Sequence, residues 1–209
     1  QNKLKDNRAN YIFSEDKEAE NIIAADQISF KYFNSDIFIF EDVSFQIKKG
    51  EHTIITGPNG SGKSTLLGMV AGVLYPVEGK LTTKTDKFGY IGATPLIFSN
   101  TLRYNLLYGT NVEVDDSTIL RVLKDLDTFK EESSYDLDKE ITNKTLSSGQ
   151  MQKVAFTRAL ISDIDVLLLA ESTANLDDAS KDKIFNILAN RNITIFNSTH
   201  DPSSFIDVD

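Results

Sequence analysis

Apolar and polar residues alternate over residues 28–32 and again over residues 43–47. Successive side chains of a strand point to opposite faces of a sheet, so this alternation predicts two half-buried strands, paired antiparallel. Two lysines and Gly50 follow the second stretch, as expected where a strand ends. The early part of the chain is therefore predicted to form a small antiparallel β-sheet.

Beyond Gly50, short apolar runs alternate with longer segments whose apolar residues have helical spacing. The apolar runs predict strands over His52–Thr56, Phe88–Gly92, Asp165–Ala170 and Ile193–Ser198. The longer segments predict helices over Lys63–Leu74, Ser117–Leu126, Gln150–Ile161 and Asp178–Asn190. This order is typical of an α/β fold with a mostly parallel sheet covered by helices. Helical spacing without strong strands, over about residues 102–148, predicts an inserted helical subdomain.

Length and composition fit one domain with a small appendage. The chain has 209 residues, of which 40% are hydrophobic and 25% charged, which is enough apolar material for a sizeable core. Residues 1–22 are mostly polar, apart from a short apolar patch at Tyr11–Phe13, and they predict a linker or arm. The domain itself is expected to cover residues 23–209.

Charge and residue usage exclude several functions. The formal net charge of −9 disfavours binding to nucleic acid, because a polyanion is repelled over most of such a surface. The lack of cysteine excludes a disulfide scaffold, a thiolate metal site and a cysteine nucleophile. The densest apolar run, Val166–Ala170, has only the length of a strand, too short to cross a bilayer. A cytosolic setting is therefore expected.

Residues 57–65 read Gly-Pro-Asn-Gly-Ser-Gly-Lys-Ser-Thr and fit the phosphate-loop pattern G-x-x-x-x-G-K-[ST] between a predicted strand and a predicted helix. Glycines let backbone N–H groups converge on phosphate oxygens, and the helix adds the positive end of its dipole. Lys63 is placed to reach the β- and γ-phosphates, and Ser64 to offer its hydroxyl to Mg²⁺. The alternative is a glycine-rich turn that matches by chance, but both flanking elements favour the phosphate loop. The candidate nucleotide-binding residues here are Gly57, Asn59, Gly60, Ser61, Gly62, Lys63, Ser64 and Thr65.

Four further motifs follow along the chain: LSSGQ at 146–150, VLLLAES at 166–172, ANLD at 174–177 and STHD at 198–201. By itself LSSGQ could be no more than the capped start of a helix. Together and in this order, the five motifs resemble the nucleotide-binding domain of ATP-binding cassette (ABC) transporters, over about residues 28–200. The resemblance implies that family's fold: a P-loop NTPase core with a mostly parallel sheet, an antiparallel β-subdomain and an inserted helical subdomain.

The resemblance also implies roles in ATP binding. Tyr32 matches the aromatic residue that stacks on adenine, with a packed strand residue as the less favoured alternative. LSSGQ is similar to the family signature LSGGQ, with Ser148 in place of the first glycine. Ser147 and Gly149 would then face the γ-phosphate of an ATP held by another subunit, with Gln150 counted among the ATP-binding residues. The implied partner is a second nucleotide-binding domain, identical or different, in an ATP-driven head-to-tail dimer.

The candidate catalytic residues are Lys63, Glu171 and His200. Glu171 follows a predicted strand, where open α/β sheets bind ligands, and matches the general base that polarises the attacking water. His200 matches the switch histidine that hydrogen-bonds the γ-phosphate, with a structural or exposed side chain as the alternative. Asp177 matches the loop that links the two ATP sites and equally fits a helix N-cap. His52, at the start of a strand, is interpreted as structural.

Two positions depart from the family pattern. Ala170 stands where the family has an aspartate that supports Mg²⁺, and Ala93 stands where it has the glutamine of the segment over residues 90–99. Ser64 and the nucleotide could still hold Mg²⁺, less well placed. We therefore expect ATP and Mg²⁺ to bind while turnover is reduced. A slow site, a naturally degenerate member with an active partner, and deliberate replacement all fit this pattern.

Residues 98–106 and 136–141 resemble segments of exporters that touch the membrane domain, which favours an exporter over an importer. The implied second partner is a transmembrane transporter domain at the cytoplasmic face of a membrane, with residues 1–22 as the remnant of the connection. The chain ends soon after His200, so we expect an excised domain that is truncated at its C-terminus. The alternatives are a soluble ABC ATPase acting on chromosomes or ribosomes, which the acidic charge disfavours, and an ATP-binding regulator without catalysis.

Overall fold

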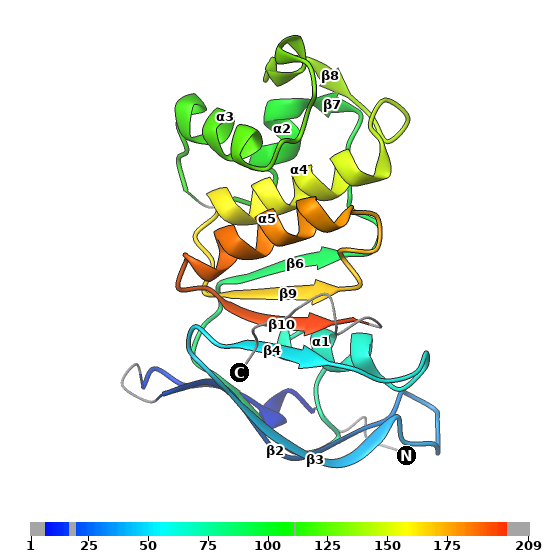
Figure 1. The fold of residues 1–209 in the computed structure, drawn as a ribbon. Helices are drawn as coiled ribbons and strands as arrows, with labels where there is room; N and C mark the ends of the chain where they lie inside the picture. Colours follow the sequence, from blue (N-terminus) through cyan, green and yellow to red (C-terminus); the bar gives the residue numbers. More distant parts are fainter. Residues whose placement is uncertain (1–6, 17–19, 111, 200–209) are drawn as a thin grey trace. The chain divides into compact units, whose positions relative to one another are not determined.

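The computed structural model describes residues 7–16, 20–110 and 112–199, and the chain divides into two compact units (Figure 1). The first unit comprises residues 1–88 and 194–209, and the second comprises residues 89–193. The phosphate loop belongs to the first unit, and the LSSGQ segment belongs to the second. Within the described part of the chain, every helix is too short or too polar to span a membrane.

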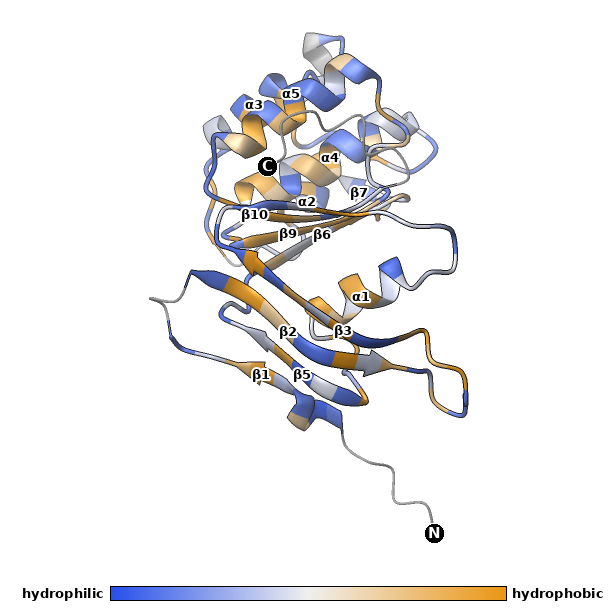
Figure 2. Ribbon diagram, turned by 60° about the horizontal axis from the view of Figure 1, so that its bottom comes forward, coloured by the Kyte–Doolittle hydropathy of each residue, from blue (hydrophilic) through white to orange (hydrophobic). Residues whose placement is uncertain are grey.

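The first unit contains a four-stranded sheet in the order β1-β5-β2-β3 (Figure 2). The strands are β1 (Tyr11–Phe13), β2 (Asn21–Phe30), β3 (Phe40–Lys48) and β5 (Glu78–Thr83), preceded by a 3-10 turn over Asn7–Asn10. β2 pairs antiparallel with β3 and β5, while β1 pairs parallel with β5. Ile23, Ile28 and Ile47 are fully buried in this sheet, and the register of β2 against β3 shifts between Ala25 and Ile28, so β2 does not keep a simple alternation.

The first unit also holds the strand and helix that flank the phosphate loop. β4 (His52–Ile55) pairs in parallel with β10 (Thr194–Ser198), and α1 (Lys63–Val70) follows the loop. All five residues of β10 are buried, and the ring of Phe196 stacks on that of Phe45 from β3 with centroids 5.7 Å apart. This packing fixes the strand from which the phosphate loop emerges.

The second unit contains two neighbouring strands, β6 (Phe88–Gly92) and β9 (Val166–Ala170), which point the same way in Figure 1. Its helices are α2 (Leu102–Leu107), α3 (Asp116–Asp125), α4 (Ser148–Ile161) and α5 (Asp178–Ala189). A 3-10 turn covers Glu132–Tyr135, and the short strands β7 (Asn100–Thr101) and β8 (Glu140–Ile141) pair antiparallel. β9 is buried along its whole length and appears apolar throughout in Figure 2. α2 and α3 both pack on α4, which is therefore the central helix of the unit.

The predicted fold class is confirmed, and the strands and helices predicted after Gly50 are all present. The first predicted helix is shorter than expected, because it ends at Val70 rather than at Leu74. Gly72 adopts φ +72, and the N–H groups of Val73 and Leu74 both donate to the carbonyl of Gly68, which closes the helix.

Two strands of the first unit have no counterpart in the predicted pattern. β5 contains a single buried apolar residue, Leu81, so it lacks the alternation that marks a strand. β1 lies inside residues 1–22, where we expected a linker, and its pairing with β5 makes Asn7–Phe13 part of the sheet unit. The hydroxyl of Tyr11 donates to the carbonyl of Val70 at 3.0 Å, and burial raises the pKa of Tyr11 to about 12. This segment is thereby fastened to the last turn of α1.

Candidate functional site

The phosphate loop, residues 57–65, runs from β4 into α1. Gly62 is the cap residue of α1, and no side chain caps this helix start. The N–H of Ser61 donates to the carbonyl of Pro58 at 3.3 Å, which curls the loop in front of the helix. Uncapped N–H groups at a helix start carry the positive end of the helix dipole. The loop therefore presents hydrogen-bond donors and positive charge to an anion such as phosphate.

Lys63 is the first residue of α1, and its side chain bends back over the loop. Its Nζ donates to the carbonyl oxygens of Gly57 at 2.8 Å and Pro58 at 2.9 Å. Only 7% of the residue is exposed, so the ammonium group lies within the loop rather than in bulk solvent. An ammonium group has three donors, and two of them are used here. The third donor and the charge are available to a phosphate oxygen.

Two loop glycines have left-handed backbone conformations. Gly62 has φ +90, and a Cβ there would lie 2.6 Å from Cγ2 of Ile39. Gly60 has φ +81, and a Cβ there would meet nothing within 4 Å, so its backbone faces open space. The exposed residues of the loop are Pro58, Asn59, Gly60, Ser61 and Ser64. The loop therefore has the open cradle that a phosphate group requires.

Tyr32 lies two residues beyond the end of β2, so it is not the packed strand residue of the alternative interpretation. Its ring packs edge-on against Phe30 with centroids 5.1 Å apart, and 49% of the residue is exposed. Its Oη lies 2.9 Å from Oγ1 of Thr65, the third residue of α1. A half-exposed aromatic ring anchored beside the phosphate loop is suited to stacking on a base.

The signature segment, residues 146–150, forms the start of α4. Ser147 is the N-cap: its Oγ accepts from the N–H of Gln150 at 3.2 Å, and Oε1 of Gln150 accepts from the N–H of Ser147 at 2.9 Å. This reciprocal capping box satisfies two backbone donors. The hydroxyl hydrogen of Ser147 takes no part in these two bonds and can be donated to a ligand. A Cβ at Gly149 would lie 3.2 Å from the carbonyl oxygen of Asn175, so the glycine lets α4 approach residues 174–177 closely.

An open cavity of about 560 Å³ lies beside the signature segment. Its lining includes Ser147, Gly149, Gln150, Lys153, Asn175 and Asp177. Asp177 caps α5, because its carboxylate accepts from the N–H of Ser180 at 2.8 Å and from the Ser180 hydroxyl at 3.1 Å. These bonds lower the pKa of Asp177. The N-cap role of Asp177 is therefore confirmed, and its role between two ATP sites stays a prediction.

Glu171 directly follows β9 and adopts a left-handed backbone conformation with φ +54. That conformation is uncommon for a residue with a side chain and often marks a functional position. The carbonyl of the next residue, Ser172, accepts a hydrogen bond from Nε2 of Gln152 on α4, which also donates to the carbonyl of Gly92 at 3.1 Å. Gln152 is fully buried. It therefore joins the ends of β6 and β9 to the helix that begins with the signature segment.

The two alanines that depart from the family pattern supply no oxygen ligands. Ala170 is the buried last residue of β9, while Ala93 is exposed and its carbonyl accepts from Nδ2 of Asn175 at 3.4 Å. Within the residues that the structure covers, no three acidic, histidine or cysteine side chains gather into a metal-binding cluster. The side chain best suited to Mg²⁺ is the exposed hydroxyl of Ser64 at the phosphate loop.

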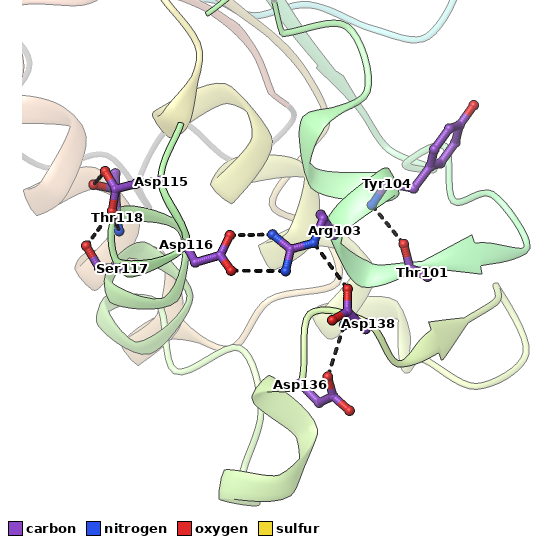
Figure 3. A network of polar contacts seen from close by, with 9 residues as sticks. All are labelled: Thr101, Arg103, Tyr104, Asp115, Asp116, Ser117, Thr118, Asp136 and Asp138. Atoms are coloured by element: carbon purple, nitrogen blue, oxygen red, sulfur yellow. Dashed lines mark hydrogen bonds and ion pairs between the residues drawn. The ribbon is translucent and has the colours of Figure 1, made fainter. Parts of the chain in front are cut away.

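Arg103 on α2 connects three segments of the second unit (Figure 3). Its guanidinium group pairs with both carboxylate oxygens of Asp116 at the start of α3, and its Nε donates to Asp138 at 3.2 Å. These hydrogen bonds, first to Asp116 and then to Asp138, raise the pKa of Arg103. The N–H of Arg103 also donates to the carbonyl of Leu137 at 2.8 Å. The network ties α2 and α3 to residues 136–141, which lead into the signature segment.

A groove of about 390 Å³ runs along α2. Its lining residues are Asn100, Thr101, Arg103, Tyr104, Leu107 and Tyr108. The rings of Tyr104 and Tyr108 are nearly half exposed, and Phe98 packs against both of them. Arg158 of α4 supports this region by donating to the carbonyls of Asn105 at 2.8 Å and Leu96 at 3.1 Å. The groove is an aromatic surface on a fixed support, suited to an apolar side chain of another protein segment.

Several residues that support the site were not predicted from the sequence. Arg103, Gln152 and Arg158 act through contacts with segments far away in the chain, which local spacing does not show. Gln152 carried one usable signal, because it is a polar residue on the apolar side of a predicted helix and polar groups in such places are usually hydrogen-bonded. The link between Tyr32 and Thr65 carried no signal, since the two residues lie in different motifs.

The structure describes one of the two histidines. His200 lies outside the described residues, so its predicted role stays a prediction. His52 is the first residue of β4, and burial lowers its pKa to about 4. The side chain is therefore neutral at pH 7, which agrees with its interpretation as structural.

The ABC transporter family model matches residues 40–174 of this chain. The matched range contains the phosphate loop, the signature segment and Glu171. The energy-coupling factor transporter ATP-binding protein EcfA1 of Lactobacillus johnsonii is 32% identical over 219 residues, an alignment that covers 91% of this chain and 74% of that protein. The family match ends at residue 174, before the end of the ANLD motif and before STHD.

Other relatives are longer than this chain. The ATP-dependent permease MDL1 of Candida albicans is 32% identical over 185 residues, which cover 78% of this chain and 27% of the permease. The chain thus spans about a quarter of that relative's length. A solved structure of a bacterial Atm1-family ABC exporter with ATP bound matches with a TM-score of 0.79 at 24% identity, over 90% of this chain and 36% of that one. This likeness establishes the fold.

Proposed function

Because this chain belongs to the ABC transporter family, we propose that it binds MgATP and powers a membrane transporter through ATP-driven head-to-tail dimerisation and ATP hydrolysis. The observation that carries this proposal is the geometry of the phosphate loop. Lys63 is buried within the loop, the start of α1 has no side-chain cap, and the backbone at Gly60 faces open space. These features together favour a phosphate ligand.

The nucleotide contacts divide between the two units. In the first unit, residues 57–65 bind the phosphates and Tyr32 stacks on the adenine ring. In the second unit, Ser147 donates its hydroxyl and Gly149 offers backbone to the γ-phosphate of an ATP held by the partner subunit. The open cavity beside the signature segment leaves room for such a ligand. Two copies arranged head to tail complete both ATP sites.

The catalytic residues of the proposal are Lys63, Glu171 and His200. The carboxylate of Glu171 polarises the attacking water, and His200 hydrogen-bonds the γ-phosphate. Ser64 would hold Mg²⁺, which when bound supplies charge neutralisation at the β- and γ-phosphates. Since Ala93 and Ala170 add no oxygen ligands, we expect slow turnover in this form.

The second partner is a transmembrane domain, which places the chain at the cytoplasmic face of a membrane. The aromatic groove along α2 is the proposed contact, because it joins exposed apolar surface to the Arg103 network and so to the segment before the signature. The relatives include a permease and, by fold, an exporter. The fold shared with an exporter agrees with the exporter that residues 98–106 and 136–141 predict.

The test is steady-state MgATP hydrolysis over a range of protein concentrations, with binding measured in parallel. We compare the chain with the variant Ala93→Gln/Ala170→Asp, and with Ala93→Gln/Ala170→Asn as a control of the same size without the carboxylate. The chain should bind MgATP and turn over slowly. The carboxylate variant should hydrolyse ATP about ten-fold faster, with a rate per chain that rises with concentration, because a positioned metal ligand stabilises phosphoryl transfer. Failure of all three proteins to bind MgATP would contradict the proposal.

A further inference from the structure

The side chains of Tyr32 and Thr65 meet although they come from different motifs. Tyr32 follows β2 and Thr65 lies in the first turn of α1, and their hydroxyl oxygens are 2.9 Å apart. Thr65 is 8% exposed, so its hydroxyl has little contact with water. The pair joins the residue proposed to stack on adenine to a residue of the phosphate loop.

Both side chains are held in place by their surroundings. The ring of Tyr32 meets the buried ring of Phe30 edge-on, at an interplanar angle of 84°. Thr65 sits on the first turn of α1, behind the cap residue Gly62. A Cβ at Gly62 would also meet the ring of Phe40 at 3.2 Å, so the chain after Tyr32 packs closely on the start of α1. Movement of the tyrosine ring therefore changes the surroundings of the Thr65 hydroxyl directly.

When phosphate is present, hydrogen-bond chemistry determines which of the two hydroxyl groups is the donor. A threonine hydroxyl has one hydrogen to donate and can accept at its oxygen. Phosphate oxygens at neutral pH act as acceptors, so a threonine that binds phosphate must donate its single hydrogen to it. The bond to Tyr32 can then form only if the tyrosine hydroxyl is the donor and Oγ1 of Thr65 the acceptor. Such a chain of hydrogen bonds strengthens each of its members.

We propose that Tyr32 is a positioning residue for the phosphate site as well as a base-stacking residue: its hydroxyl donates to Thr65 and so directs the Thr65 hydroxyl toward the nucleotide phosphates. Base recognition and phosphate binding are thereby coupled through one hydrogen bond. This inference rests on the proposed function, because it requires the phosphates to lie at residues 57–65. It goes beyond stacking, since stacking needs the aromatic ring and not the hydroxyl.

The test uses two ligands, MgATP and magnesium tripolyphosphate, which has the phosphates without the base. Titration calorimetry gives the affinity of each ligand for the chain and for Tyr32→Phe. This substitution keeps the ring and removes only the hydroxyl. We expect it to weaken both ligands about five-fold, the usual effect of losing one hydrogen bond. An unchanged affinity for tripolyphosphate would overturn the inference, because a residue that only stacks on the base acts on ATP alone.

A matched control is available on the same helix. The hydroxyl of Tyr11 donates to the carbonyl of Val70 at the last turn of α1, so Tyr11→Phe removes a tyrosine hydroxyl from the opposite end of α1. It should lower thermal stability without changing either affinity. If Tyr11→Phe weakens tripolyphosphate as much as Tyr32→Phe does, general loosening of α1 explains the effect and the inference is wrong.

A double-mutant cycle with Thr65→Val tests the coupling itself. If the tyrosine acts through Thr65, Tyr32→Phe should add nothing to tripolyphosphate binding once the Thr65 hydroxyl is gone. If the two substitutions weaken tripolyphosphate binding independently, so that their fold-changes multiply, the proposed coupling through Thr65 is wrong. The variant Lys63→Ala distinguishes an error in this inference from an error in the proposed function. If Lys63→Ala leaves the affinities for MgATP and tripolyphosphate unchanged, the phosphates do not bind at the loop. Both the proposed function and the inference are then wrong.

Discussion

Two helices, α1 and α4, begin at segments that we propose to face phosphate, and they begin in opposite ways. α1 starts at Gly62 in a left-handed conformation with no side-chain cap, and the ammonium group of Lys63 lies within its loop. α4 starts with a reciprocal capping box between Ser147 and Gln150. The first helix start leaves its N–H groups to a ligand, whereas the second uses two of its own side chains to satisfy two backbone N–H groups.

The difference separates the roles of the two segments. The start of α1 is fitted to an anion by the backbone and one buried cation, so it should bind ATP in a single chain. At the start of α4 the capping box satisfies the N–H groups of Ser147 and Gln150, so the segment contributes the hydroxyl of Ser147 and the backbone of Gly149. α5 goes further, because its cap is the carboxylate of Asp177, which disfavours phosphate at that helix start. The phosphate loop before α1 and the signature segment at the start of α4 therefore differ in chemistry as well as in sequence.

The largest expected effect comes from Lys63→Ala. Loss of the buried ammonium group removes a charge-assisted contact to phosphate and the two bonds that hold the carbonyls of Gly57 and Pro58. We expect ATP affinity to fall about 100-fold, in line with the loss of a buried charged hydrogen-bond partner. Lys153→Ala, on α4 beside the signature segment, is the control, and it should leave ATP binding by a single chain unchanged. Equal losses in both variants would erase the distinction between the two helix starts.

The glycine cap of α1 should be less tolerant than its loop neighbour. Gly62→Ala places a Cβ against Ile39 and holds the alanine in a left-handed backbone conformation. We therefore expect a loss of about 2 kcal/mol in stability. Gly60→Ala has a similar φ but open space, so its cost should be about 1 kcal/mol. Chemical denaturation measures both values. Equal costs would show that the close packing at Gly62 is unimportant.

The capping box of α4 should contribute a smaller amount. Ser147→Ala removes the acceptor for the N–H of Gln150, and we expect a loss of about 1 kcal/mol in stability. Ser148→Ala changes the next serine, which is exposed and lies inside the helix, and it should be close to neutral. Thermal unfolding of the two variants tests this contrast. A similar effect of both would mean that the box does not stabilise α4.

The smallest effect is a pH dependence of the carboxylate caps. Hydrogen bonds from Ser117 and Thr118 lower the pKa of Asp115, the cap of α3, from 3.8 to about 2. Because the folded-state pKa is depressed, this cap stabilises the protein above about pH 4 and loses its effect as pH falls toward 2. Asp115→Asn should reduce the pH dependence of the melting temperature between about pH 4 and pH 2. Ser147→Ala should leave that dependence unchanged, because a hydroxyl cap does not titrate in this range. An unchanged pH profile in Asp115→Asn would contradict the assignment.

The parts of the fold that the sequence predicted are those with strong local signals. α4 and α5 start within two residues of their predicted positions, because a capping side chain stands before each helix. β9 was evident as an uninterrupted apolar run. β5 was missed because its residues are mostly polar, and its pairing with β2 depends on partners about 55 residues earlier in the chain.

The site divides in the same way. The phosphate loop was predicted residue by residue, since its chemistry is encoded in one short segment. Three links were not predictable: Tyr32 with Thr65, Gln152 with Ser172, and Arg103 with Asp116. Each joins side chains from separate segments, and only the folded chain brings them together. Sequence motifs therefore indicated the groups that we propose to meet ligands, and the structure supplied the residues that hold those groups in position.

The most direct test of the central claim is complementation between two inactive variants. Lys63→Ala damages the phosphate loop, and Gly149→Asp places a negative charge in the signature segment. A head-to-tail dimer of the two variants contains one intact ATP site, formed by the loop of one chain and the signature segment of the other. Sedimentation with MgATP should show monomers for each variant alone, dimers for the unsubstituted chain and dimers for the equimolar mixture. If the unsubstituted chain dimerises while the mixture stays monomeric, the two segments do not form a shared ATP site.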